Sequence, residues 1–254
     1  MSGKNKITVM NFSGIYRKEQ FSEETDWLDV SDIPGTNCYC DEEAFDEILK
    51  RIAEFSTEGI HFIDSGNYHY MSRIWLEKIA EPVTLVVFDN HTDMQPPAFG
   101  GLLSCGGWIE AALTEIPLLQ RVILIGPDEE AFFQAEPELR ERTDFLSRER
   151  LRAMTGEQRE EFLEEKIKES SGALYISVDK DILCPGEADT SWSQGDLTLS
   201  ELLEMLQTVL KCGEALGKEI VGVDICGESE SSDNREENIK ANRALIKCLN
   251  ETKY

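Results

Sequence analysis

The sequence predicts one α/β domain, residues 1–254, in which a doubly wound, mostly parallel sheet carries helices on both faces, making three layers. Near-continuous apolar runs, rather than strict alternations, are typical of strands that are buried on both faces. These runs alternate with helical patterns, and such alternation favours right-handed parallel crossovers. No Gly/Ser linker, internal repeat or low-complexity tract divides the chain. With 41% hydrophobic residues, the chain can bury a substantial core as one unit.

Six strands and six helices are expected along the chain. The strands are expected at 7–12, 59–64, 84–89, 121–126, 173–179 and 219–225, and the helices at roughly 42–55, 70–80, 107–114, 157–169, 198–212 and 236–249. The fifth helix has the clearest start, because Thr198 and Glu201 have the spacing of a capping box. The segment 127–160 is rich in charge and contains two prolines, so it is expected to be a peripheral excursion.

The charge balance and the cysteines restrict the class of protein. The chain has 50 Asp and Glu residues against 25 Lys and Arg residues, a formal net charge of −25. This charge repels nucleic acids and anionic membrane surfaces, so neither is an expected partner. Seven scattered cysteines without a C-x-x-C pair favour a reducing cytosol. No signal-peptide core and no apolar run of ~18 residues is present, which predicts a soluble, cytoplasmic protein.

Potential metal ligands follow three of the predicted strands. In chain order they are His69, Asp89, His91, Asp93, Asp179 and Asp181. Alternate side chains of extended backbone share a face, so the three in DNHTD can converge on one point, as can the pair in SVDKD. Open α/β sheets bind ligands at the carboxyl ends of their strands. A single Asp there usually caps a helix or forms a turn. Six such residues at one edge favour a metal site instead.

The negative charges of this group would have to be balanced by bound cations. Four carboxylates gathered at one edge would repel one another and raise their own pKa values. Two divalent ions would balance four carboxylates and two neutral imidazoles, and this set of oxygen and nitrogen ligands suits Mn²⁺. Two ions close together can share a water, lower its pKa and present hydroxide to an electrophilic carbon. The expected cofactors are therefore two divalent ions per chain, preferably manganese.

The order of these motifs resembles the ureohydrolase superfamily of arginase, agmatinase and formiminoglutamase. GNYHY stands for the family's Gly-rich turn that ends in His, DNHTD for its DAHxD motif, and SVDKDILCP for its SxDxDxxDP motif. The resemblance covers about residues 60 to 228 and implies an arginase-type fold with a dinuclear manganese site. It implies that His91 and Asp181 complete a site whose other side holds the remaining four ligands, with Asp93, Asp179 and a hydroxide among the bridging groups. Asp93 and His91 are the expected catalytic residues.

The predicted substrate pocket departs from the family pattern. The family carries a proton-shuttling His in a turn after DAHxD, whereas LSCGGW stands here and contains Ser104 and Trp108. The family's last strand ends D-x-x-E, whereas DICGE places Glu228 one residue late, behind Gly227. Ser104, Trp108 and Glu228 are therefore the expected substrate-binding residues of a rebuilt pocket. His61 lies early in its own strand and is expected to be structural.

The expected function is hydrolysis of a C–N bond in a guanidino- or amidino-type small molecule other than arginine. The resemblance implies that metal-bridged hydroxide attacks the carbon. Two alternatives remain open: a metal-dependent deacylase or deacetylase, and a catalytically silent metal-binding protein of the same fold, which the missing histidine favours. No GxSxG, GK[ST] or GxGxxG sequence supports another class of enzyme. The expected partner is a small-molecule substrate, and homo-oligomer formation is left open.

Overall fold

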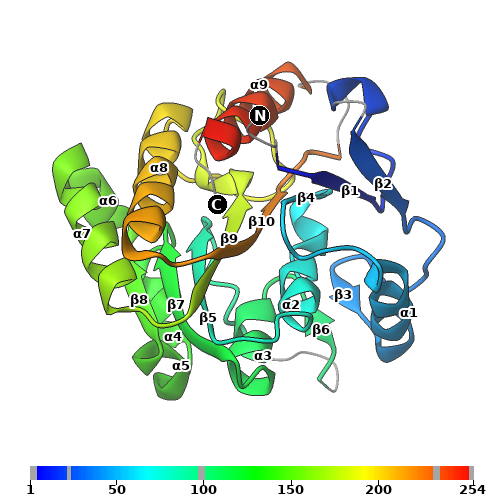
Figure 1. Ribbon diagram of the computed structural model, residues 1–254, viewed down its shortest axis with the longest axis horizontal. Helices are drawn as coiled ribbons and strands as arrows, with labels where there is room; N and C mark the ends of the chain where they lie inside the picture. Colours follow the sequence, from blue (N-terminus) through cyan, green and yellow to red (C-terminus); the bar gives the residue numbers. More distant parts are fainter. Residues whose placement is uncertain (1–4, 22–23, 97–100, 231–234, 252–254) are drawn as a thin grey trace.

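A parallel sheet forms the centre of the fold (Figure 1). The computed structural model describes residues 5–21, 24–96, 101–230 and 235–251. In these residues the 8-stranded sheet has the order β2-β1-β4-β10-β9-β5-β7-β8, and all neighbouring strands pair in parallel. The strands are β1 (Ile7–Asn11), β2 (Thr25–Asp29), β4 (Ile60–Ile63), β5 (Val83–Phe88), β7 (Leu119–Ile125), β8 (Thr143–Leu146), β9 (Ala173–Asp179) and β10 (Ile220–Cys226). A separate antiparallel pair joins β3 (Tyr39–Cys40) to β6 (Leu103–Ser104).

Helices cover both faces of the sheet. They are α1 (Glu42–Ile52), α2 (Met71–Leu76), α3 (Trp108–Glu115), α4 (Glu129–Gln134), α5 (Pro137–Glu141), α6 (Arg148–Ala153), α7 (Gly156–Glu169), α8 (Leu199–Leu216) and α9 (Arg235–Glu251), with the 3₁₀ turns η1 (Lys18–Gln20), η2 (Gly66–Tyr68) and η3 (Lys180–Ile182). Figure 1 shows α1, α2 and α3 on one side of the sheet and α7, α8 and α9 on the other. Alternate residues of β5 divide between two hydrophobic cores, since Leu85 and Val87 enter one and Val86 and Phe88 the other. The three-layer α/β prediction is confirmed.

The strands with continuous apolar sequences were the predictable ones. All six expected strands are present, displaced by at most one or two residues, and the expected capping box of Thr198 and Glu201 forms at the start of α8. The two remaining strands, β2 and β8, lie at the two edges of the sheet and are only partly buried. Their sequences TDWLD and TDFL lack a continuous apolar run because only one edge of each is paired. The segment 127–160 lies at one edge of the fold, as the prediction of a peripheral segment requires, but it also contributes β8 to the sheet.

The topology gathers the strand ends that carry the predicted ligands. In a parallel sheet all carboxyl ends lie at the same edge. The strands β4, β10, β9 and β5 are consecutive neighbours in the middle of the sheet. The segments that follow β4, β5 and β9 therefore meet at the carboxyl ends of the central strands. Further strands of the sheet flank this position on both sides. Among the described helices, none has the length and apolar character that a membrane crossing needs.

Candidate metal centre

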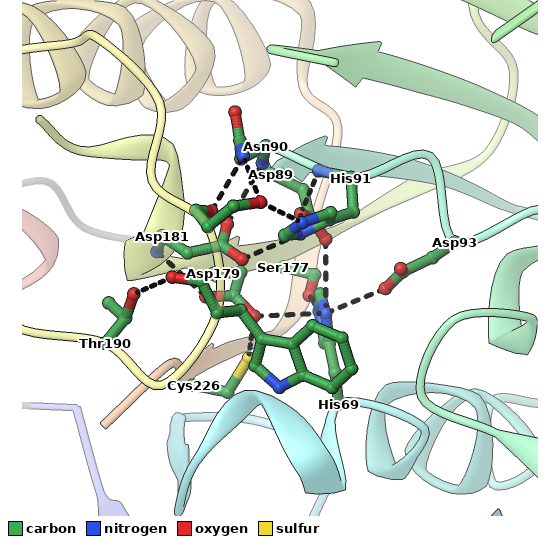
Figure 2. A network of polar contacts seen from close by, with 12 residues as sticks. His69, Asp89, Asn90, His91, Asp93, Ser177, Asp179, Asp181, Thr190 and Cys226 are labelled. Carbon is green, nitrogen blue, oxygen red and sulfur yellow. Dashed lines mark hydrogen bonds and ion pairs between the residues drawn. The ribbon is translucent and has the colours of Figure 1, made fainter. Parts of the chain in front are cut away.

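The six predicted ligands converge at the carboxyl edge of the sheet (Figure 2). His69 follows η2, which continues from β4. The DNHTD residues follow β5, and the two aspartates of SVDKD lie at the end of β9 and in η3. All six line one cavity of about 260 Å³. A larger cavity of about 870 Å³ lies between α1, α3 and the β3–β6 pair, and it shares Ser104 with the smaller one but contains none of the six.

His69 turns one ring nitrogen toward three carboxylates. Its Nδ1 atom lies 3.2 Å from Asp89 Oδ2, 3.0 Å from Asp93 Oδ2 and 3.5 Å from Asp179 Oδ2. On the other side of the ring, Nε2 lies 2.9 Å from Ser177 Oγ, and that hydroxyl donates to Asp224 Oδ1 at 2.6 Å. Because Ser177 gives its proton to Asp224, it is free to accept a hydrogen bond from Nε2–H of the ring. This contact fixes the tautomer that leaves a lone pair on Nδ1 for a metal.

His91 repeats this arrangement on the other side of the cluster. Its Nδ1 atom lies 2.8 Å from Asp181 Oδ2 and 3.6 Å from Asp89 Oδ1. Its Nε2 atom lies 2.8 Å from a serine hydroxyl, Ser193 Oγ. The side chain is 33% exposed, whereas His69 is almost completely buried. The two imidazoles therefore present equivalent nitrogens to the carboxylates, one from the interior and one from the open side of the site.

Asn90 ties the two ligand-bearing loops together. Its backbone N–H donates to Asp181 Oδ1 at 3.1 Å, and its side-chain amide donates to the Ser193 carbonyl at 2.7 Å. Arg148 in turn donates to the side-chain oxygen of Asn90 at 2.6 Å. These bonds hold the loop after β5 against the loop after β9, so the ligands from both strands are positioned by the same contacts.

Asp89, and not Asp93, joins the two halves of the cluster. Asp89 belongs both to the group with His69 and Asp93 and to the group with His91 and Asp181, in each of which the candidate ligand atoms lie within 4.8 Å of one another. Asp93 faces only the His69 side, and its Oδ2 accepts a hydrogen bond from Trp108 Nε1 at 2.6 Å. The geometry therefore contradicts the prediction of Asp93 as a bridging residue. The backbone of Asp93, in the left-handed region at φ 49°, turns its side chain away from the second group.

Burial and mutual repulsion give the cluster a high affinity for positive charge. Burial and the nearby charge of Asp89 raise the pKa of Asp93 to about 6. Burial raises the pKa of Asp181 well above its usual value, and the charges of Asp179 and Asp89 add to this effect. Burial alone would lower the pKa of His91, but Asp181 and Asp89 outweigh it and raise that pKa to about 12. Carboxylates that compete for protons in this way would also bind divalent cations.

The residues present fit a centre that holds two divalent ions. The buried atom Asp89 Oδ2 accepts no well-directed hydrogen bond from the described residues. This is expected for an oxygen whose partner is a bound cation. Both imidazoles direct Nδ1 into the cluster and anchor Nε2 on a hydroxyl, which is the usual support of a metal-binding histidine. Asp89 is common to the group with His69 and the group with His91, so neighbouring ions would share this carboxylate as a ligand.

Three residues were expected to contact substrate, and the structure separates them. Ser104 lines the cavity beside Tyr39 and Gln95. Trp108 is completely buried and does not line the cavity, because its indole packs behind Asp93. Glu228 is also buried and forms an ion pair with Lys180. The predictions of Trp108 and Glu228 as substrate-binding residues are therefore corrected to residues that support the site from behind.

Two further residues at the site were not predicted. Lys180, between Asp179 and Asp181 in the sequence, is completely buried and contacts Glu228 and the side-chain oxygen of Asn242, the latter at 3.0 Å. Cys226 ends β10 next to Asp179. The lysine within SVDKD could have been recognised from the sequence, because a charged residue that directly follows a buried strand needs a partner of opposite charge. The thiol gave no signal, since its proximity to the cluster depends on the pairing of β10 with β9.

Comparison with known proteins agrees with this fold and site. The model of the arginase family matches residues 7–249. A Thermotoga maritima protein, described only as uncharacterized, is 26% identical over 250 residues, which span 96% of this chain and 89% of that protein. Formimidoylglutamase from Bacillus subtilis has a similar structure, with a TM-score of 0.72 and 16% identity over 98% of this chain and 87% of that one.

Two more solved structures share the fold. Arginase from Bacillus caldovelox has a TM-score of 0.67 and 18% identity, covering 96% of this chain and 98% of that one. Proclavaminate amidino hydrolase from Streptomyces clavuligerus also has a TM-score of 0.67, with 17% identity over 98% of this chain and 92% of that one. These structures establish the fold, and the match of the family model spans nearly the whole chain. The chain belongs to the arginase family.

Proposed function

We propose that this chain is a metal-dependent hydrolase that cleaves a C–N bond of a small amidino- or guanidino-type molecule other than arginine. The observation that carries the proposal is the convergence of two histidine Nδ1 atoms and four aspartate side chains on the wall of one cavity. Family membership supports it, and the structurally similar proteins include an arginase, a formimidoylglutamase and an amidino hydrolase. The proposed cofactor is a pair of divalent ions, with Mn²⁺ preferred.

Each group of the site has a defined task in this proposal. His69, Asp93 and Asp179 would hold one ion, His91 and Asp181 the other, and Asp89 would contact both. When bound, the ions would supply Lewis acidity and a water of lowered pKa. Ser177 and Ser193 keep the two imidazoles oriented, which preserves ligand geometry as the substrate enters. Ser104, Tyr39 and Gln95 form the polar part of the cavity wall that would orient the substrate.

Arginine is a poor fit to the cavity. The glutamate that ends the family's D-x-x-E motif corresponds to Gly227 here, and Glu228 is engaged by Lys180. Apart from the predicted metal ligands, the described residues that line the cavity are neutral: Cys38, Tyr39, Gly66, Gln95, Ser104, Cys105, Gly106 and Trp192. Among the described residues that line the cavity, a guanidinium group would therefore find no carboxylate to bind except those already assigned to metal. A substrate group that is neutral, or that loses its charge as it binds, would fit this cavity better than a guanidinium ion.

The neutral cavity wall also supports a second candidate function, hydrolysis of the amide bond of an N-acyl compound. An amide carbon is uncharged, so it needs no carboxylate in the cavity wall, and the same pair of ions would polarise its carbonyl. Amide hydrolysis releases a carboxylate, whereas cleavage of a guanidino compound releases urea. The products therefore distinguish the two candidates.

A panel of substrates tests the proposal. Guanidino, amidino, formimino and N-acyl compounds are offered to the manganese-loaded wild type, to His91→Asn and Asp181→Asn, and to Asp196→Asn as the control. Asp196 carries the same charge on the loop that follows η3 but pairs with Arg152 at the surface. Turnover should disappear in the two ligand variants and persist in the control. Equal background hydrolysis by all four proteins would instead support a catalytically silent metal-binding protein.

A further inference from the structure

Cys226 places a sulfur atom beside the His69 side of the cluster. The residue ends β10 and is completely buried. Its Sγ atom lies 3.0 Å from Asp179 Oδ2, the same oxygen that faces His69 Nδ1. Figure 2 shows the thiol next to Asp179 and on the same side of the cluster as His69. Candidate ligand atoms of Cys226, Asp179 and His69 all lie within 4.8 Å of one another, so one ion could contact all three.

The position of this thiol is set by the sheet. Cys226 and Asp179 are register partners in the parallel pairing of β10 with β9, and both are the last residues of their strands. Neighbouring strand ends in register place their side chains side by side on the same edge. The contact between the thiol and the carboxylate therefore follows from the fold and does not depend on a mobile loop.

A buried cysteine often serves only as a small apolar side chain. The other buried thiols with a hydrogen-bond acceptor behave in that way. Cys40 Sγ lies 3.7 Å from the Asp41 carbonyl, and Cys248 Sγ lies 3.9 Å from the Leu203 carbonyl, both at the long end of sulfur contacts. Cys226 instead approaches a carboxylate oxygen that is itself a predicted ligand. A metal ion bound by this carboxylate would therefore also lie within reach of the sulfur.

We propose that Cys226 is an additional ligand of the ion held by His69 and Asp179, so that the centre binds that ion through sulfur as well as oxygen and nitrogen. This inference rests on the proposed metal centre. The thiol would release its proton to solvent as the sulfur–metal bond forms, which keeps the charge balanced. A sulfur ligand favours softer ions such as Zn²⁺, Fe²⁺ or Co²⁺ over Mn²⁺. The two positions of the centre would then differ in metal preference, with the His91 side retaining only oxygen and nitrogen ligands.

Cobalt spectroscopy tests the sulfur ligand without any enzyme assay. Wild type, Cys226→Ser and Cys105→Ser are loaded with Co²⁺, and bound cobalt is measured by equilibrium dialysis. Cys105 is the matched control, because it is a buried thiol that lines the cavity of the six predicted ligands but belongs to none of the candidate ligand groups among the described residues. A near-ultraviolet thiolate-to-cobalt charge-transfer band should appear in wild type and Cys105→Ser and be absent from Cys226→Ser. The preference for Zn²⁺ over Mn²⁺ should also fall at least about tenfold in Cys226→Ser.

X-ray absorption of the zinc-loaded wild type gives the answer independently of any variant. A sulfur shell at ~2.3 Å should accompany the shorter nitrogen and oxygen distances of ~2.0–2.2 Å. Bound metal with no sulfur shell and no charge-transfer band would overturn the role of Cys226 while leaving the proposed function intact. No binding of cobalt or zinc at all would instead overturn the metal centre itself.

Discussion

The indole Nε1 of Trp108 lies 2.6 Å from Oδ2 of Asp93. Trp108 is the last residue of the LSCGGW turn and the first residue of α3, and its ring centroid lies 4.8 Å from that of His69. The residue therefore contacts two predicted ligands at once and has no exposed surface. In this chain the last residue of the turn that follows the DNHTD motif therefore supports the candidate metal ligands from behind the cavity.

Trp108→Phe should weaken metal binding without unfolding the protein. The ring volume is largely kept, but Asp93 loses its hydrogen bond, and loss of such a supporting contact costs about 10- to 100-fold in metal affinity. Trp75→Phe is the control, because Trp75 is equally buried and its indole nitrogen has no hydrogen-bond partner among the described residues. Manganese affinity measured by calorimetry should fall only in Trp108→Phe. An equal loss in both variants would show that packing, and not the hydrogen bond, is responsible.

Glu228→Gln should reduce stability. The change leaves the completely buried Lys180 ammonium without its ion-pair partner, and breaking a buried pair in this way costs about 3–5 kcal/mol. Urea denaturation should show this loss, whereas Glu187→Gln, which removes the surface partner of Lys240, should change the unfolding free energy by less than about 1 kcal/mol. A raised KM with unchanged stability would return Glu228 to the substrate pocket.

Gly227→Ala should displace a metal ligand. The backbone of Gly227 is left-handed at φ 89°, and an added Cβ would meet Asp179 Oδ1 at 2.2 Å and the Lys180 backbone nitrogen at 2.9 Å. Gly186→Ala imposes nearly the same strain at φ 91° but places its Cβ in open space. Metal content should therefore fall in Gly227→Ala and remain at the wild-type level in Gly186→Ala. Retention of full metal content by both variants would contradict the close approach of Gly227 to the site.

His61 should lower the free energy of unfolding at acidic pH. Its ring is completely buried and stacked 3.9 Å from the ring of Trp75, and burial lowers the pKa of His61 to about 3. In the unfolded chain, His61 binds a proton with a pKa of ~6.5. In the folded chain it stays neutral until the pH approaches about 3. The free energy of unfolding therefore falls as the pH drops from the unfolded pKa toward the folded pKa.

His61→Phe keeps a ring on Trp75 but removes the titrating group. The wild type should therefore lose about 2 kcal/mol more than the variant between about pH 7 and about pH 5, measured by urea denaturation. Parallel pH profiles of the two proteins would show that His61 has the same pKa in the folded and the unfolded chain, which would contradict the effect of burial. His61 is completely buried and is not among the residues that line the cavity, as expected for a structural residue.

The cluster of candidate metal ligands was predictable because its geometry is local to strand ends. Parallel strands bring their carboxyl ends to one edge, so residues such as Asp89 and Asp179 could be placed together from the apolar runs that precede them. The bridging role was not predictable. Whether Asp89 or Asp93 joins the two halves depends on a single left-handed residue in the loop, which alternation along an extended chain does not foresee.

The substrate side was less predictable because it depends on tertiary contacts. Trp108 and Glu228 lie at the expected positions in the sequence, but buried partners elsewhere take their polar groups. The partner of Glu228 comes from a different strand end, and that of Trp108 from the loop after β5. A motif shows which residues are near a site, whereas the direction in which each side chain points is set by neighbours that the motif does not contain.

The metal content of the purified protein tests the central claim most directly. After loading with excess manganese and removal of free metal, elemental analysis should find about two ions per chain in the wild type, because Asp89 joins two groups of candidate ligands. Asp89→Asn should lose most of both ions, whereas Asp93→Asn should lose mainly the ion on the His69 side. Less than about one ion per chain in the saturated wild type would contradict the dinuclear centre.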